Sequence, residues 1–324
     1  CGLVANKNTL PGDTLTALAS GVRLGTPWLT QRGLGPADMD RLAGMIHKVL
    51  THIHPFAYIG LKGELSRGKI DLDVLEEVRR EVDEMAAVTL AEPAPYGSAC
   101  PHDAILPRTV GNAFGAVETE SSPKGVENAL AAAKEEAVCL DLRGSGIFLL
   151  GRGRAKPFIQ ELSTSNLADL ATCQAQRTFL LDRRGKLLAD VAVWRLEMDA
   201  RGYDRYLVTA RPEVKDRLTA WLRGMSDGYI LFDDQDIMRK VQGPVVVEDM
   251  SEVEDQGQRV LLAIQGPAAG ALLHRLGGPA HLTASEVWSG ELVAQPASVS
   301  AMVARLDLGS APSHSERYEL LVPS

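Results

Sequence analysis

The chain has 324 residues, of which 45% are hydrophobic and 23% charged, as in a globular protein with room for two or three domains. Its net charge of −8 argues against a nucleic-acid or anionic-membrane partner, and no apolar run is long enough to span a bilayer. No signal peptide is visible, and the four cysteines are scattered without a CxxC spacing. We therefore expect a reduced, cytoplasmic protein.

The first 88 residues are predicted to form a small α/β domain. A turn-rich loop at Asn6–Asp13 precedes short extended pieces between Ser20 and Gly33. Apolar residues then recur every three or four positions over residues 35–50 and 71–88, which predicts two helices. Between them, His52 and His54 would share one face of an extended chain, as metal ligands can. No third ligand lies nearby in the sequence, so we predict no metal site.

Residues 89–123 are rich in Pro, Gly, Ala and Ser and show no sustained period, which predicts a linker. From residue 124 to 324, helices and strands mix without a regular βαβ repeat. This pattern predicts an α+β fold with mixed, largely antiparallel sheets. Within it, residues 138–153 are predicted to form a hairpin with a Gly-rich turn at Gly144–Gly146, and residues 176–197 to form two strands about a turn at Asp182–Gly185.

The second strand of that pair, "GKLLADVAVWR", carries one carboxylate among apolar residues. Alternation places four apolar side chains on one face, and Leu188, Asp190, Ala192 and Trp194 on the other. An ionised carboxylate is costly to bury without partners. Asp190 therefore either contacts a ligand or is held by Arg177, Arg195 or backbone N–H groups.

Two motifs near the N-terminus are shared with a known family. "NKNTLPGD" (Asn6–Asp13) and "SGVRLGTPWLTQRG" (Ser20–Gly33) resemble the C-terminal domain of serine hydroxymethyltransferase, over residues 4–87. The resemblance implies that Arg23 grips the carboxylate of an amino-acid substrate, and the alternative is a structural or surface arginine. That enzyme also needs pyridoxal phosphate on a lysine of its large domain, and no such lysine motif is found here. We expect no pyridoxal phosphate in this chain alone, and a large domain would be a partner in trans.

The remainder, residues 110–324, resembles the T-protein of the glycine cleavage system, an aminomethyltransferase, and its folate-binding relatives. The resemblance rests on ordered stretches that include "CLDLRGSGIFLLGRGRAKPFIQELSTSNLADL", "GKLLADVAVW", "VLLAIQGPAAGALL" and "RYELLVP". It implies that a methylene unit passes from an aminomethyl-lipoyl carrier protein to tetrahydrofolate, without a metal. The family's catalytic folate-binding aspartate falls on Asp190.

The resemblance also implies the rest of the folate site. Trp194 takes the place of the family's aromatic residue, and it could instead be ordinary core. Arg177 stands where the family often has Tyr, and Thr209 where it has Asn, with an ordinary strand residue as the alternative. Glu316 is the stand-in for a second folate-binding glutamate, and Ala192 lies between Asp190 and Trp194.

Three functions follow from these two resemblances. The first is an aminomethyltransferase-like protein that uses Asp190. The second is a non-catalytic folate-binding or regulatory module, and the third a remnant of a serine hydroxymethyltransferase fusion. The predicted T-protein-like folate-binding region, residues 124–324, lacks the family's final barrel domain, which carries a folate-clamping arginine. That domain would be a partner in trans.

Overall fold

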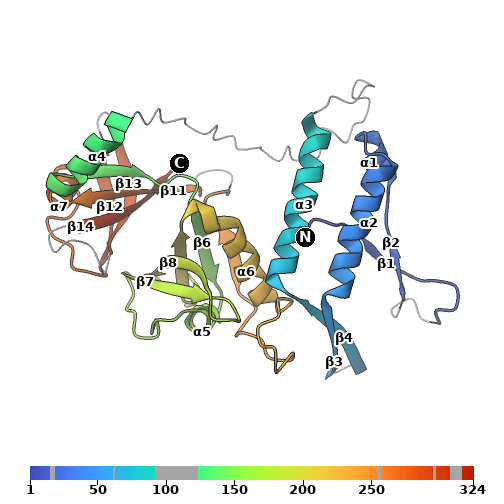
Figure 1. The fold of residues 1–324 in the computed structure, drawn as a ribbon. Helices are drawn as coiled ribbons and strands as arrows, with labels where there is room; N and C mark the ends of the chain where they lie inside the picture. Colours follow the sequence, from blue (N-terminus) through green and yellow to red (C-terminus); the bar gives the residue numbers. More distant parts are fainter. Residues whose placement is uncertain (15–18, 61–62, 92–122, 254–256, 295–296, 307–315) are drawn as a thin grey trace. The chain divides into compact units, whose positions relative to one another are not determined.

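The computed structural model describes residues 1–324 except 15–18, 61–62, 92–122, 254–256, 295–296 and 307–315 (Figure 1). The chain divides into two compact units, Cys1–Glu118 and Thr119–Ser324. Helix α3 (Leu72–Ala91) occupies the first residues of the predicted linker, and nearly all the rest of that linker lies outside the described residues. The proposed domain limits at residues 88 and 124 therefore stay a prediction.

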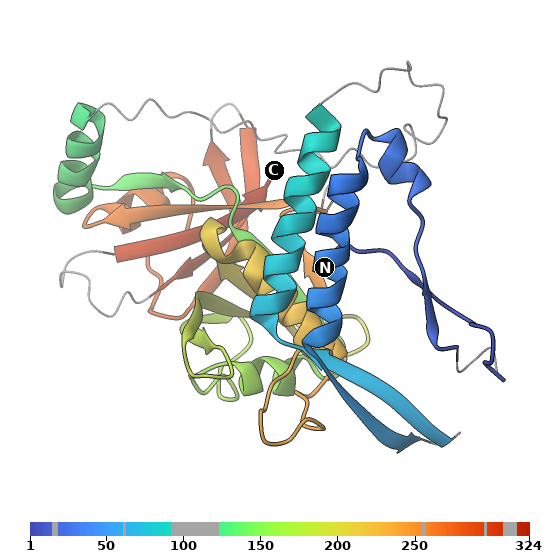
Figure 2. The same ribbon diagram turned by 45° about the vertical axis from the view of Figure 1, so that its right-hand side comes forward.

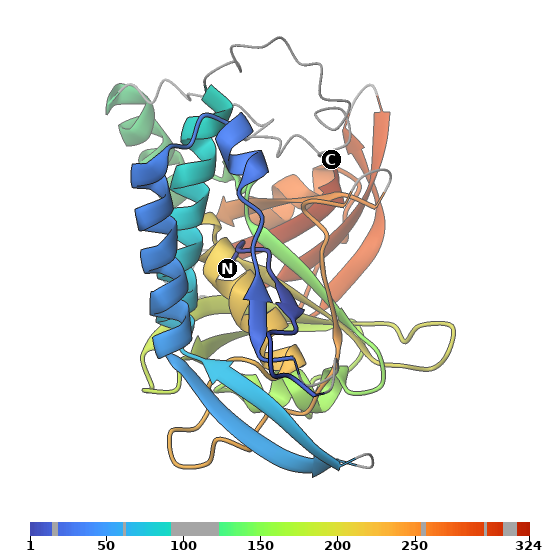
Figure 3. The same ribbon diagram turned by 90° about the vertical axis from the view of Figure 1, so that its right-hand side faces the viewer.

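The first unit is built on two helices, α2 (Pro36–Thr51) and α3, which lie side by side in every view (Figures 1, 2 and 3). Pro36 occupies the first helical position of α2, and the Asp38 side chain accepts a hydrogen bond from the Gly35 N–H at 2.8 Å. The two helices bury Met45, Val78 and Met85 between them. Both predicted helices are thus confirmed.

Smaller elements of this unit were less visible in the sequence. The loop predicted at Asn6–Asp13 begins with strand β1 (Asn6–Asn8), which pairs with β2 (Gly21–Arg23). A short helix, α1 (Pro27–Gln31), follows. Strands β3 (Ile53–Gly60) and β4 (Gly63–Ile70) pair antiparallel along their whole length, and no prediction was made for them.

The second unit contains two five-stranded sheets in which all neighbouring strands are antiparallel. The first sheet has the order β10 (Val246–Asp249), β6 (Gly146–Gly151), β9 (Arg205–Ala210), β8 (Leu187–Leu196), β7 (Gln174–Leu181). The second has the order β12 (Val287–Ala294), β13 (Ala297–Arg305), β14 (Glu316–Pro323), β11 (Arg259–Gly266), β5 (Val138–Asp141). The predicted α+β class with largely antiparallel sheets is confirmed.

The predicted hairpin over residues 138–153 is wrong. Strands β5 and β6 do form, and Gly144 has the positive φ of a turn, but the two strands do not pair with each other. Instead β5 pairs with β11 in the second sheet, and β6 pairs with β9 and β10 in the first. The local turn signal matched a hairpin, but long-range pairing decided the partners, so this segment links the two sheets (Figure 1).

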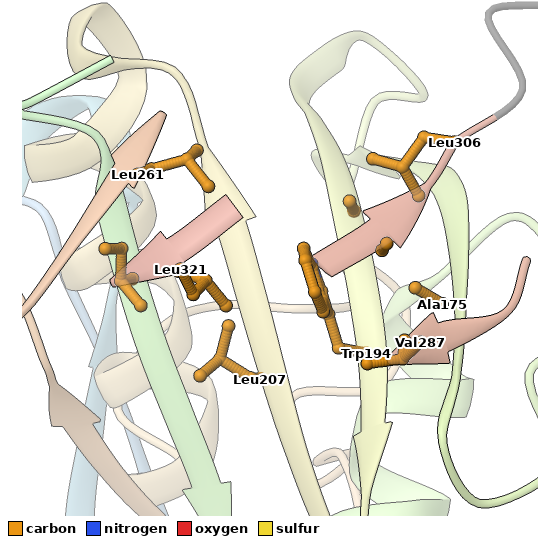
Figure 4. Close-up of a cluster of buried hydrophobic side chains, with 10 residues drawn as sticks. Ala175, Trp194, Leu207, Leu261, Val287, Leu306 and Leu321 are labelled. Carbon is orange, nitrogen blue, oxygen red and sulfur yellow. The ribbon is translucent and has the colours of Figure 1, made fainter. Parts of the chain in front are cut away.

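The two sheets pack face to face, and their inner faces share one hydrophobic cluster (Figure 4). Trp194 and Leu207 come from the first sheet, and Leu261 and Leu321 from the second. Helices α5 (Ala155–Leu162) and α6 (Lys215–Asp227) contact the first sheet. Helices α4 (Pro123–Glu135) and α7 (Ala269–Arg275) contact the second. Each fully buried large apolar side chain stabilises this arrangement by about 1.5–3 kcal/mol.

Candidate functional site

Strand β8 presents two different faces, as the alternation in the sequence predicts. Ala189, Val191 and Val193 are buried on one face. On the other, Ala192 and Trp194 belong to the cluster between the sheets. Asp190 shares this second face, but 26% of its side chain is exposed. The strand therefore runs from covered core at Trp194 toward a partly open end at Asp190.

The register of the first sheet brings the predicted site residues together. Arg177 of β7, Ala192 of β8 and Thr209 of β9 are directly opposite one another, so they form one row across three strands. Trp194 and Asp190 lie two positions to either side of Ala192 on the same strand. Because directly opposite residues share a face, all five side chains belong to the face that meets the second sheet.

The open end of this face is polar and aromatic. An Nη2–Oδ2 contact joins Arg177 to Asp190 as an ion pair, and 31% of the Arg177 side chain is exposed. Phe179 lies directly opposite Asp190 on β7, the edge strand, and is 49% exposed. Phe179 was not among the predicted site residues, although its spacing of two from Arg177 on a strand assigns both side chains to one face.

The covered end contains a chain of hydrogen bonds between the sheets. Trp194 is fully buried, and its Nε1 donates to Thr209 Oγ1 at 3.4 Å. Thr209 Oγ1 in turn donates to Glu319 Oε2 at 3.4 Å, and Arg317 Nη2 donates to Glu319 Oε1 at 3.0 Å. The complete burial of Trp194 favours its alternative role as core. It is one of the clustered side chains between the sheets (Figure 4).

Glu316, the predicted second folate-binding glutamate, lies away from the Asp190 face. Glu316 and Tyr318 lie on the face of β14 that packs with α7, where Tyr318 donates to Glu316 Oε2 at 3.0 Å. Glu316 also pairs with Arg305 at 3.3 Å. Alternation along β14 directs Glu319 toward Thr209, so Glu319 is a buried carboxylate that contacts the row of predicted site residues, and the folate role of Glu316 stays a prediction. Burial, followed by the hydrogen bond to Glu316, raises the pKa of Tyr318 to about 12.

Comparison with known proteins assigns the larger part of the chain to a family. The GCVT N-terminal domain family matches residues 89–306, two thirds of the chain. The chain belongs to the GCVT N-terminal domain family. A separate match, to the serine hydroxymethyltransferase family, covers residues 1–46. Both resemblances seen in the sequence are thus confirmed, and the Asp190 face lies within the GCVT match.

Individual relatives match the first unit. Serine hydroxymethyltransferases from Salinispora tropica and Mycolicibacterium smegmatis are 40% identical over 87 residues and 46% identical over 68 residues. These alignments cover 26% and 21% of this chain, and the chain spans only 18% and 14% of those relatives. Among solved structures, the glycine cleavage system aminomethyltransferase T from Bartonella henselae matches with a TM-score of 0.40 and 20% identity. That match covers 62% of this chain and 46% of that one.

Arg23, the residue that the serine hydroxymethyltransferase resemblance singles out, lies at the surface of the first unit. Arg23 is exposed at the end of β2, and its neighbours Val22 and Leu24 are 61% and 48% exposed. An exposed strand of three residues cannot enclose a cofactor or exclude water from it. The surroundings of Arg23 therefore do not fit pyridoxal phosphate.

Other candidate sites can be placed as well. In the described ranges, no group of three or more His, Cys, Asp or Glu side chains is arranged to hold a metal ion. His52 ends α2, and its Nδ1 lies 2.7 Å from the Lys48 carbonyl oxygen. Among the described helices, none is both long and apolar enough to cross a membrane. A cavity of about 230 Å³ adjoins the end of β7 and contains none of the predicted site residues (it is lined by Glu161, Leu162, Ser163, Thr164, Leu181, Asp182 and Phe232).

Proposed function

We propose that the second unit binds tetrahydrofolate at the Asp190 end of the first sheet and transfers a one-carbon unit to it. The observation that carries the proposal is the clustering of Asp190, Arg177 and Phe179 at the partly open end of an otherwise apolar face. A flat heterocycle can stack on Phe179 while its N–H groups donate to the Asp190 carboxylate. Membership of the GCVT N-terminal domain family supports this choice of ligand.

In this proposal the one-carbon donor is an aminomethyl-lipoyl carrier protein, as the T-protein resemblance implies. In the transfer, the aminomethyl carbon loses its bonds to ammonia and to the lipoyl sulfur and forms bonds to N5 and N10 of tetrahydrofolate, while the two protons from these nitrogens pass to ammonia and to the sulfur. Positive charge develops on the transferred carbon and on the nitrogen bonded to it as the leaving group departs. The Asp190 carboxylate would favour that charge, because a fixed negative group in a partly dry site stabilises it more than water does. Glu319 supplies a second buried negative group, held by Thr209 and Arg317.

A second candidate function is folate binding without transfer. One observation favours it: the Asp190 carboxylate is already engaged by the Arg177 guanidinium, which offsets its charge. A neutralised carboxylate still accepts a hydrogen bond but stabilises a developing cation less. An assay with the aminomethyl-lipoyl carrier protein distinguishes the two, since only the transferase converts tetrahydrofolate to its methylene form.

Binding is tested by calorimetric titration of the full chain with tetrahydrofolate, in the wild type and in Asp190→Asn. The amide keeps the shape of the side chain but loses its charge, so the fold should persist while affinity falls about 10- to 100-fold. In the transfer assay the same variant should be inactive. The matched control is Asp141→Asn, because Asp141 also pairs with an arginine, Arg143, at 2.6 Å, but at the exposed end of strand β5. Normal binding by Asp190→Asn would contradict the proposal.

A further inference from the structure

The first unit carries an exposed apolar segment between two points where the chain is anchored. Leu3 and Leu34 pack against the cluster that α2 and α3 bury. Between these two anchors, five described large apolar side chains are exposed, with exposed fractions from 45% to 89% (Val4, Leu10, Val22, Leu24 and Trp28). We call these five residues the apolar segment. A folded unit rarely leaves so many large apolar side chains uncovered in one short stretch, and such exposure is typical of a surface that binds a partner.

The secondary structure of this segment does not cover its own apolar side chains. Strands β1 and β2 have three residues each, and within the described part of the chain they pair only with each other. Leu10 lies over Gly21, since a Cβ built on that glycine would be 2.7 Å from Leu10 Cγ. Leu10 therefore packs at the start of β2, next to the position of Val22. A two-stranded sheet of this size is marginally stable in water and is stabilised by a surface that covers it.

The charges around Val22 indicate what the covering surface must contain. Arg23 stands between Val22 and Leu24, and among the described residues it forms no ion pair or hydrogen bond. Lys7 lies directly opposite Val22 on β1. Protein interfaces are enriched in tryptophan and arginine, which Trp28 and Arg23 supply here. The complementary partner therefore has an apolar surface with a carboxylate for Arg23.

The comparisons indicate which partner has such a surface. The apolar segment lies wholly within residues 1–46, which match the serine hydroxymethyltransferase family. This chain spans only 18% of the enzyme from Salinispora tropica, so more than four fifths of that enzyme lies outside the aligned stretch. We propose that the apolar segment docks onto the body of a serine hydroxymethyltransferase, meaning the part outside the aligned stretch. In such an enzyme the stretch and the body belong to one folded chain, so the body supplies the cover that the described part of the first unit does not.

A second copy of this chain is a poorer occupant of the same surface. In a twofold dimer one patch faces itself. The positive charges of Lys7 and Arg23 would then lie against the same charges of the second copy, and like charges facing one another in an interface are strongly unfavourable. The net charge of −8 also opposes self-association. The inference does not rest on the proposed function, because no residue of the proposed folate site takes part in it.

The experiment is a capture assay in which the full chain carries an affinity tag. The chain is co-expressed with a truncated Salinispora tropica serine hydroxymethyltransferase that lacks the stretch aligned over 87 residues. We expect the truncated enzyme to co-purify with the full chain in a one-to-one ratio. Val22→Asp should reduce the captured amount at least about tenfold, because docking would bury a carboxylate against apolar groups. The intact enzyme should not be captured, because its own stretch occupies the surface of its body.

Val293→Asp is the matched control, because this valine is 53% exposed on β12 of the second unit, and it should leave capture unchanged. Circular dichroism checks that both variants keep the fold. The inference is overturned if the soluble full chain captures no truncated enzyme or captures the intact enzyme equally well, or if Val22→Asp captures as much as the wild type. It is also overturned if the chain alone is a dimer that Val22→Asp dissociates, since a second copy would then be the occupant. Binding of tetrahydrofolate, measured in parallel, tests the proposed function separately.

Discussion

At the scale of single residues, two carboxylates of the second unit differ in burial and in the number of their partners. Asp190 keeps part of its surface in water and has one arginine partner. Glu319 is buried between the sheets and depends on the hydroxyl of Thr209 and the guanidinium of Arg317. A buried charge without partners would be strongly destabilising, so the partners of Glu319 are structural requirements. The Asp190 carboxylate is partly exposed, so a ligand can replace its arginine partner with a smaller loss of stability.

Thr209→Val tests the buried network, since valine has nearly the same shape but no hydroxyl. The change leaves Trp194 Nε1 without its acceptor and Glu319 Oε2 without its donor. We expect the free energy of unfolding in urea to fall by about 1–3 kcal/mol. Thr219→Val is the control, because its hydroxyl only donates to the Lys215 carbonyl in the same helix, and it should change stability by less than about 0.5 kcal/mol. Equal effects of the two substitutions would contradict a special role for Thr209.

The sequence was enough to single out Asp190, but it was not enough to choose between Glu316 and Glu319. Period-two alternation on β8 was enough to set Asp190 apart from the apolar face beside it. The same rule on β14 separates Glu316 from Glu319, but choosing the inward glutamate required knowing which face of β14 meets the first sheet. That knowledge depends on pairing and packing between distant segments, which local sequence does not encode.

At the scale of elements, strand β14 carries two polar networks on its opposite faces. Arg317 and Glu319 serve the space between the sheets, while Glu316 and Tyr318 lie toward α7. The prediction of a hairpin at residues 138–153 was wrong about which strands pair. Its turn and both strands were correct, but β5 and β6 belong to different sheets. Local patterns predicted most elements of the second unit, whereas their partners were set by contacts far apart in the chain.

The second network of β14 gives the protein a pH dependence at high pH. Burial, and then the hydrogen bond to Glu316, raises the pKa of Tyr318 from 10 to about 12. The folded state thus holds the phenol proton more tightly than the unfolded state does. Its contribution is fully present below pH 10 and is lost as the pH rises through about 12, a loss of about 2–3 kcal/mol in total. Urea unfolding at several pH values should show this fall.

Tyr318→Phe should flatten that pH dependence, since the substituted ring has no proton to lose. The control is Tyr203→Phe, at a tyrosine that is 43% exposed, and it should keep the wild-type slope. An unchanged slope in Tyr318→Phe would show that other groups cause the loss of stability.

At the scale of the whole molecule, the two units have very different cores. The second unit has extensive clusters on both faces of its second sheet, whereas the described cluster of the first unit centres on three residues of two helices. The sequence predicted two unlike halves because each carries its own family motifs. The proposed folate site belongs to one unit only. All its residues, from Arg177 to Glu319, lie in the second unit.

This placement predicts that a fragment comprising Thr119–Ser324 keeps the folate site. The fragment contains both sheets and the hydrophobic cluster between them, which together are large enough to fold independently. Its dissociation constant for tetrahydrofolate, measured by calorimetry, should agree with that of the full chain within about twofold, because no site residue has been removed. The complementary fragment Cys1–Glu118 should not bind. If Thr119–Ser324 unfolds cooperatively in urea but binds more than about tenfold more weakly than the full chain, then the first unit supplies part of the site.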